Sequence, residues 1–135
     1  MWFTRKPKLT GLKLGVAGEE WVVYLYRKKG YKIIARNYAL FGKKQFGEID
    51  IVAGRKSTIH IVEVKTRRSE SFMAIEETLN FRKQGLLRRM AHLYLQQNPQ
   101  YQNWDIQIDF AAVLMDEVDN SVISVKLIEN AIEDS

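Results

Sequence analysis

The chain lacks the residues on which several common kinds of site depend. It contains no cysteine, which excludes disulfide bonds and thiolate metal sites and fits a reducing cytoplasm. It has only two histidines, and neither has a partner at metal-ligand spacing. No apolar run approaches the roughly 20 residues of a membrane span, and no apolar core follows the basic N-terminus as in a signal peptide. We therefore expect a cytoplasmic protein that makes no use of a membrane.

What the chain does contain is typical of one folded domain. Hydrophobic residues make up 46% of its 135 residues and charged residues 27%, which are ordinary globular values. A chain of this length can bury about two-thirds of its unfolded surface. We expect a basic N-terminal arm over residues 1–14 and a single domain over residues 15–135.

Charge is unevenly distributed along the chain. The formal net charge is +5, yet residues 116–135 hold six acidic residues and one lysine, so the rest of the chain carries +10. A basic body of this kind indicates a polyanionic partner. A solvated basic surface with no partner is the alternative, and charge alone does not separate the two.

The pattern of apolar residues predicts a helix, three strands, a helix and two strands. Ala17, Trp21 and Leu25 repeat at helical spacing, and Gly30 is a typical C-terminal cap. The strands are expected at 31–40, 45–53, 59–66, 106–114 and 122–128, with turns at 41–44 and 54–58, a polar loop at 67–73 and a largely helical stretch at 74–97. Asn80 is a candidate N-cap that divides this stretch.

The third predicted strand carries the most informative residues. Side chains alternate along a strand, so Glu63 and Lys65 lie on one face, ~6.6 Å apart, and Val62 and Val64 lie on the other. His60 also alternates away from Glu63 and is expected to be structural. A carboxylate and an ammonium on an apolar strand are costly to bury without partners. A structural ion pair between them is the plain alternative to a catalytic role.

Asp50 on the preceding strand is the expected partner. If residues 55–58 form a four-residue hairpin loop, the numbers of facing residues sum to 113, and Asp50 lies opposite Glu63, with Cβ atoms ~5 Å apart. A two-residue loop would keep the faces but shift the register by two, and an odd loop would require a bulge. Two opposed carboxylates repel, and hard oxygen ligands of this kind bind Mg²⁺ or Mn²⁺.

This arrangement would suit hydrolysis of a phosphodiester. A cation held by Asp50 and Glu63 can acidify a bound water and polarise a phosphoryl oxygen, and Lys65 can orient the water or stabilise developing charge. Glu19, which lies beside Gly18 on the first helix, is a further candidate. Its alternative role is to favour the N-terminal half of that helix electrostatically.

Basic residues after the third strand and on the second helix form a second group of candidates. We expect Arg67, Arg68 and Lys83 to contact nucleic acid, because phosphate contacts are made mainly by lysine and arginine. For Lys83 the alternative is a solvated helix face.

Several motifs in sequence order resemble the YraN-like family of small bacterial proteins, which belongs to the PD-(D/E)xK nuclease superfamily and is similar to archaeal Holliday junction resolvases. They are Gly15 with Glu19-Glu20, Gly30-Tyr31, Ala35-Arg36-Asn37-Tyr38, Gly47-Glu48-Ile49-Asp50, Val62-Glu63-Val64-Lys65-Thr66-Arg67, Lys83-Gln84, Tyr94-Leu95, Asp109-Phe110 and Asn130-Ala131. The resemblance runs from about Gly15 to Ala131.

The resemblance implies an α/β fold with a restriction-endonuclease-like core, α-β-β-β-α-β, in which helices flank a central mixed sheet. It implies that residues 15–135 form a nuclease-like domain with an active site of Glu19, Asp50, Glu63 and Lys65. It also implies that the main-chain carbonyl of Val64 completes a metal shell with Asp50 and Glu63.

Three functions follow from these expectations. The first is a Mg²⁺- or Mn²⁺-dependent nuclease that acts on DNA, including branched or junction DNA, and a junction resolvase should form a two-fold homodimer. The second is a nucleic-acid-binding module that keeps the fold without catalysis. The third is a protein-interaction subunit whose basic surface binds an acidic protein.

Overall fold

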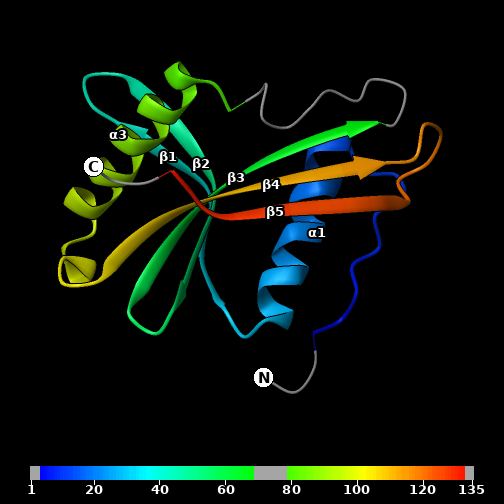
Figure 1. Ribbon diagram of the computed structural model, residues 1–135, viewed down its shortest axis with the longest axis horizontal. Helices are drawn as coiled ribbons and strands as arrows, with labels where there is room; N and C mark the ends of the chain where they lie inside the picture. The colour runs from blue at the N-terminus through cyan, green and yellow to red at the C-terminus, as the bar shows by residue number, and fades with distance from the viewer. Residues whose placement is uncertain (1–3, 69–78, 133–135) are drawn as a thin grey trace.

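The computed structural model describes residues 4–68 and 79–132, except for the side chain of Phe46. Its elements are α1 (Leu14–Lys28), β1 (Lys32–Phe41), β2 (Gln45–Arg55), β3 (Thr58–Arg68), α3 (Phe81–Gln97), the short 3₁₀ helix η2 (Pro99–Tyr101), β4 (Asp105–Met115) and β5 (Val122–Ile132) (Figure 1). The predicted order of helices and strands is confirmed. The strands are longer than expected, and Arg67 and Arg68 belong to β3 rather than to a loop. The rest of that expected loop and the start of the helical stretch lie outside the described residues.

The five strands form one mixed sheet in the order β1-β2-β3-β4-β5. Only β3 and β4 pair in parallel, and the other three pairings are antiparallel. Parallel neighbours need a crossover connection, and the chain between β3 and β4 includes α3. The expected α/β class and restriction-endonuclease-like core are therefore confirmed.

A helix covers each face of the sheet, so the strands carry apolar residues on both sides. Ile51 and Ala53 of β2 pack in the core beneath α1, whereas Val52 between them packs in the core beneath α3. In Figure 1, α1 lies beneath the right-hand half of the sheet and α3 lies beside the left-hand half. The two helices cover different halves of the sheet, and the candidate site lies where these halves meet.

Local chemistry sets the ends and the approach of both helices. Gly30 follows α1 with a φ of +91°, as the cap prediction requires, and the Asn80 side chain caps α3 by accepting from the Lys83 N–H at 2.9 Å. Gly18 brings α1 close to β3, because a Cβ at this position would lie 1.8 Å from the Thr66 hydroxyl.

None of the described helices combines the length and apolar character that crossing a membrane requires.

The described part of the segment before α1 packs on the domain. Leu9 is buried, with 7% of its surface exposed, and Leu12 packs against the same core. The side-chain amide of Asn120 donates to the carbonyl oxygens of Leu9 and Leu12 at 2.7 and 2.8 Å. The sequence pattern missed this because two leucines among basic residues show no periodicity.

Candidate functional site

The hairpin between β2 and β3 places Asp50 and Glu63 on the same face of the sheet. Facing residues sum to 113 from Arg55↔Thr58 to Ile51↔Val62, as predicted. The turn is shorter than expected. It has two central residues, 56 and 57, with φ of +49° and +60°, which suit a tight hairpin. The expectation that a two-residue turn would shift the register is wrong, because this turn has the same centre as the four-residue loop.

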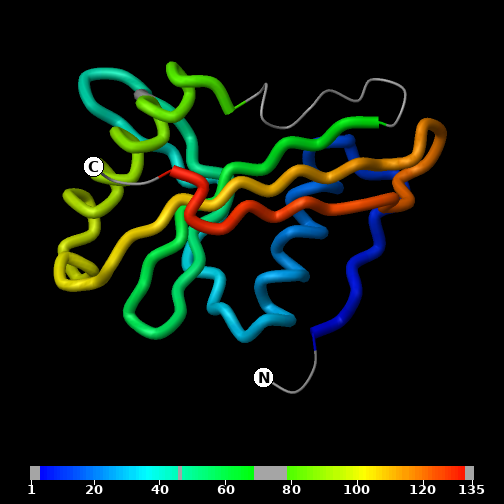
Figure 2. Tube along the Cα trace, viewed as in Figure 1, coloured from blue at the N-terminus to red at the C-terminus, as the bar shows by residue number. Residues whose placement is uncertain are grey.

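The sheet forks where the two carboxylates lie. Within the described strands, β2 and β3 stop pairing after Ile51↔Val62, although β2 continues along β1 and β3 continues along β4. Figure 2 shows the β1–β2 hairpin turning toward α3 while β3 runs the other way beside β4. At the fork, Asp50 Oδ2 accepts a hydrogen bond from the Val64 N–H at 2.9 Å. A side chain thus replaces the strand partner of this amide.

Glu63 lies in the fork and is almost completely buried. Only 8% of its side chain is exposed, and its Oε2 lies 2.7 Å from the Lys83 Nζ of α3. The structure therefore pairs Glu63 with Lys83, and not with Lys65 as in the simple ion-pair alternative. Lys83 lies in the first turn of α3, three residues after the N-cap Asn80, and reaches Glu63 across the fork. Its ammonium lies where a cation is needed to balance a buried carboxylate.

Asp50 is the most perturbed carboxyl of the cluster. Burial raises its pKa to about 7, and the charges of Glu63 and Glu19 and a hydrogen bond with Glu63 act in the same direction. The Val64 N–H opposes this rise because it stabilises the ionised form. The ionised form of Asp50 is therefore disfavoured beside two other carboxyls, which is the condition that a divalent cation relieves.

Glu19 reaches the fork from α1 through an asparagine. The Asn37 amide donates to Glu19 Oε1 at 3.0 Å. Asn37 lies in β1 between residues paired with Ile49 and Ile51, so it falls opposite Asp50. Its φ of +48° is left-handed, a conformation that asparagine adopts more easily than most residues. This bend in β1 accompanies the departure of β2 from β3.

The basic candidates occupy three different positions. Lys65 alternates with Thr66, which faces α1, and so lies on the Glu63 side. It is half-buried and, in the part of the chain that the structure describes, makes no hydrogen bond or ion pair. Arg67 donates to the carbonyl of Thr66 at 3.1 Å. Arg68 donates to the carbonyls of residues 116 and 119 in the β4–β5 turn, at 2.8 and 2.9 Å.

The donor set suits a cation that keeps much of its water shell. Among the described residues, no group of three or more His, Cys, Asp or Glu side chains is arranged to hold a metal ion. The close pair is Asp50 and Glu63. Mg²⁺ is usually bound by one or two carboxylates together with waters and substrate phosphates. A set of two carboxylates therefore fits Mg²⁺ or Mn²⁺ better than a metal that needs a full protein cage.

Comparison with known proteins identifies the family of the chain. Residues 18–113, which include Glu19, Asp50, Glu63 and Lys83, match the model described as "Uncharacterised protein family UPF0102". The chain belongs to the UPF0102 family. This is the YraN family that the sequence motifs resemble, so that prediction is confirmed.

Relatives in the UPF0102 family cover most of the chain. The chain is 40% identical to a UPF0102 protein of Syntrophomonas wolfei over 78% of its own length and 87% of the relative. It is 39% identical to one of Caldicellulosiruptor saccharolyticus over 88% and 96%, and 37% identical to one of Alkaliphilus oremlandii over 87% of both chains. These similarities show the family and extend across the whole candidate site.

The sequence does not predict which partners two residues of the site, Asn37 and Lys83, contact. Asn37 was seen only as part of a family motif, although an asparagine inside a strand pattern is a signal for a left-handed bend. Lys83 was assigned to phosphate contact, because the sequence does not show that α3 starts next to β3. Both residues contact a carboxylate of the cluster.

Proposed function

We propose that this protein is a Mg²⁺- or Mn²⁺-dependent nuclease that hydrolyses phosphodiester bonds in DNA in the bacterial cytoplasm. The observation that supports this most is the sheet fork, where Asp50 and Glu63 converge and the pKa of Asp50 rises to about 7. Burying two opposed carboxyls at a break in a sheet costs free energy. A divalent ion bound between them would offset that cost.

Each residue of the fork has a separate task in this proposal. Asp50 and Glu63, with the carbonyl of Val64, would hold a cation whose chemistry is to acidify water and polarise a phosphoryl oxygen. Lys65, which has no other partner among the described residues, would hold the attacking water or neutralise charge on the phosphate.

Glu19 and Asn37 would position the Asp50 side of the fork through their hydrogen bond. Arg67 would contact the DNA backbone, and Lys83 would leave Glu63 for a phosphate. Arg68, which donates to two carbonyls of the β4–β5 turn, would hold that turn beside them.

One observation favours a second candidate function, a nucleic-acid-binding module without catalysis. The Lys83 ammonium already balances Glu63 at 2.7 Å, so the fork can be stable without a metal ion. In this case Lys83 would be a permanent structural partner. The basic surface would then supply binding alone.

Cleavage assays separate the two functions. Purified protein is incubated with linear, nicked and four-way DNA in Mg²⁺, Mn²⁺ or EDTA. We expect cleavage that EDTA abolishes and that Asp50→Asn lowers by at least about a thousandfold, a typical loss for a group that holds a catalytic metal. Asp105→Asn, the same change at an exposed carboxylate of β4, is the matched control and should cleave normally. Salt-sensitive DNA binding without cleavage in any metal would establish the second function instead.

If the protein prefers four-way DNA, its assembly should be two-fold symmetric. A junction resolvase cuts two strands of like polarity, so we propose that it acts as a two-fold dimer. Light scattering during gel filtration, with and without four-way DNA, measures the assembly. A monomer in both samples would restrict the proposal to single-strand cuts.

A further inference from the structure

A second polar cluster lies on the α1 side of the sheet and takes no part in the proposed chemistry. Asp109 of β4 is completely buried. Its Oδ2 accepts from the Tyr26 hydroxyl at 2.6 Å and from His60 Nδ1 at 2.8 Å. Its Oδ1 accepts from the Gln107 amide and the Asn130 N–H, both at 2.9 Å. Burial alone would raise the pKa of Asp109, but these hydrogen bonds outweigh it and hold the pKa below its ordinary value.

The ionised Asp109 fixes how His60 presents its ring. Since the carboxylate can only accept, the proton lies on Nδ1, and Nε2 is left for another partner. Within the described residues, His60 Nε2 makes no hydrogen bond. Every buried side-chain nitrogen and oxygen among these residues has a partner, so Nε2 is not one of the buried atoms. Nε2 must therefore lie at the 5% of His60 that remains exposed. This opening faces a pocket of about 350 Å³.

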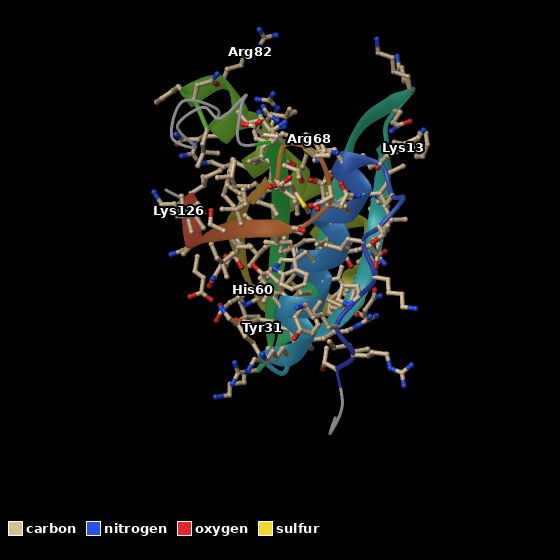
Figure 3. All side chains as sticks on the ribbon, turned by 90° about the vertical axis from the view of Figure 1, so that its right-hand side faces the viewer. Lys13, Tyr31, His60, Arg68, Arg82 and Lys126 are labelled. Atoms are coloured by element: carbon tan, nitrogen blue, oxygen red, sulfur yellow. The ribbon has the colours of Figure 1, made fainter. Side chains whose placement is uncertain are left out.

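The pocket carries more positive than negative charge. Its other lining residues are Tyr31, Arg55, Lys56, Thr58, Gln107 and Glu129. The Arg55 guanidinium lies over the Tyr31 ring at 5.5 Å, and that ring meets His60 edge-to-face at 4.8 Å. Figure 3 shows Tyr31 and His60 together toward one end of the molecule, with Arg68 and Arg82 toward the other. No lining residue of this pocket belongs to the carboxylate cluster at the sheet fork.

We propose that this pocket binds a phosphate group, with Arg55 and Lys56 as its donors and His60 Nε2 facing the bound group. The Asp109 carboxylate holds the His60 ring through Nδ1, so Nε2 is fixed toward the pocket and toward any group bound there. Arg55 and Lys56 outnumber Glu129, so an anion is favoured over a metal ion. The aromatic Tyr31 and the volume of the pocket, within the ~300–1,000 Å³ range of small-ligand sites, leave room for a nucleoside. The phosphate can belong to a free nucleotide or to the 5′ end of a DNA strand.

NMR of the histidine rings tests this proposal on the whole chain. The sequence has only His60 and His92, so a His92→Gln variant assigns both sets of ring signals. In EDTA, the protein is titrated with inorganic phosphate, AMP and a short single strand with or without a 5′-phosphate. We expect saturable shifts of the His60 signals, with His92 unmoved by phosphate and AMP. Because EDTA removes divalent ions and cleavage is scored separately, failure here leaves the nuclease proposal intact.

A pair of arginine variants provides the control without disturbing the buried cluster. Arg55→Gln should weaken binding by about tenfold, the loss expected for one charge-assisted hydrogen bond. Arg82→Gln, the same change at an exposed position of α3, should leave it unchanged. Response to AMP and phosphate identifies a free nucleotide, and response to the phosphorylated strand alone identifies a DNA end. The proposal is wrong if no probe moves His60 at about 10 mM, or if both variants weaken binding equally.

Discussion

Asp50 shows the conflict that a buried carboxyl imposes on a fold. Its pKa in the folded chain is about 7, against 3.8 for an ordinary aspartate. The folded state therefore keeps a proton that the unfolded chain releases, and stability falls as pH rises from about 4 to about 7. Above pH 7 the full penalty of ionisation is present. Active sites often trade stability for function in this way.

Substitution of Asp50 by asparagine should therefore stabilise the metal-free protein. Asparagine can still accept from the Val64 N–H and carries no charge toward Glu63 and Glu19. In EDTA at pH 8 we expect a gain on the order of 1–2 kcal/mol, or about 3–8 °C in Tm. The gain should shrink at pH 5, where Asp50 itself is mostly protonated. Thermal melts at both pH values measure this, and an equal or larger gain at pH 5 would contradict the assigned pKa.

Lys83 is the residue whose role the structure changes most. Because its ammonium lies 2.7 Å from Glu63, Lys83→Met leaves a nearly buried carboxylate without its partner. We expect a loss of about 1–3 kcal/mol in EDTA. Mn²⁺ should restore more stability to this variant than it adds to the wild type, since no ammonium then competes for Glu63.

Arg82→Met, at the exposed neighbouring position of α3, is the control for Lys83→Met. Its free energy of unfolding should change by less than about 0.5 kcal/mol. Thermal melts with and without Mn²⁺ give all the values. Equal Mn²⁺ responses in wild type and Lys83→Met would mean that lysine and metal do not share a position.

At the scale of elements, two glycines on the two helices should respond to alanine in opposite ways. A Cβ at Gly18 would lie 1.8 Å from the Thr66 hydroxyl and 2.9 Å from its Cβ, whereas a Cβ at Gly85 would meet only the tip of Arg89, at 3.8 Å. Gly18→Ala should destabilise the protein by about 1–3 kcal/mol. Gly85→Ala should stabilise it by about 0.5–1 kcal/mol. Urea unfolding measures both, and a neutral Gly18→Ala would show that α1 can move away from β3.

The elements were predictable wherever a local signal controls them. The Asn80 cap, the Gly30 cap and the β2–β3 register each depend on a few neighbouring residues, and each was confirmed. The opposition of Asp50 and Glu63 followed from that register. The fork itself was not predictable, because no local signal in β2 or β3 marks the loss of pairing beyond Ile51↔Val62, which coincides with the bend at Asn37 in a different strand.

Contacts across the whole molecule account for the remaining differences. Lys83 is 20 residues from Glu63 in sequence, and Leu9 is 111 residues from the Asn120 amide that binds its carbonyl. No periodicity within one segment carries this information. The cluster around Asp109 joins α1, β3, β4 and β5 in the same way, so His60 could be assigned a structural role from sequence but not the pocket in front of it.

The uneven charge of the whole molecule predicts how it should bind DNA. The chain outside residues 116–135 carries a formal charge of +10, and part of the acidic segment is already engaged. Asp116 Oδ1 accepts from the Val118 N–H within the β4–β5 turn, and Arg68 donates to main-chain carbonyls of the same turn. Each phosphate that binds the basic part of the chain should release counterions.

Two adjacent arginines of β3 should separate DNA contact from folding. Arg67→Ala should leave the Tm unchanged, weaken binding to all DNA sequences alike and reduce the slope of log K against log salt by about 0.9, the value for one phosphate contact. Arg68→Ala should lower the Tm, because Arg68 donates to two carbonyls and to Asn120 in the β4–β5 turn. Fluorescence anisotropy between about 50 and 200 mM salt, in Ca²⁺ in place of Mg²⁺ or Mn²⁺, gives the slopes. If the slope is the same for Arg67→Ala and wild type, Arg67 does not contact DNA, and the basic surface that binds phosphate lies elsewhere on the molecule.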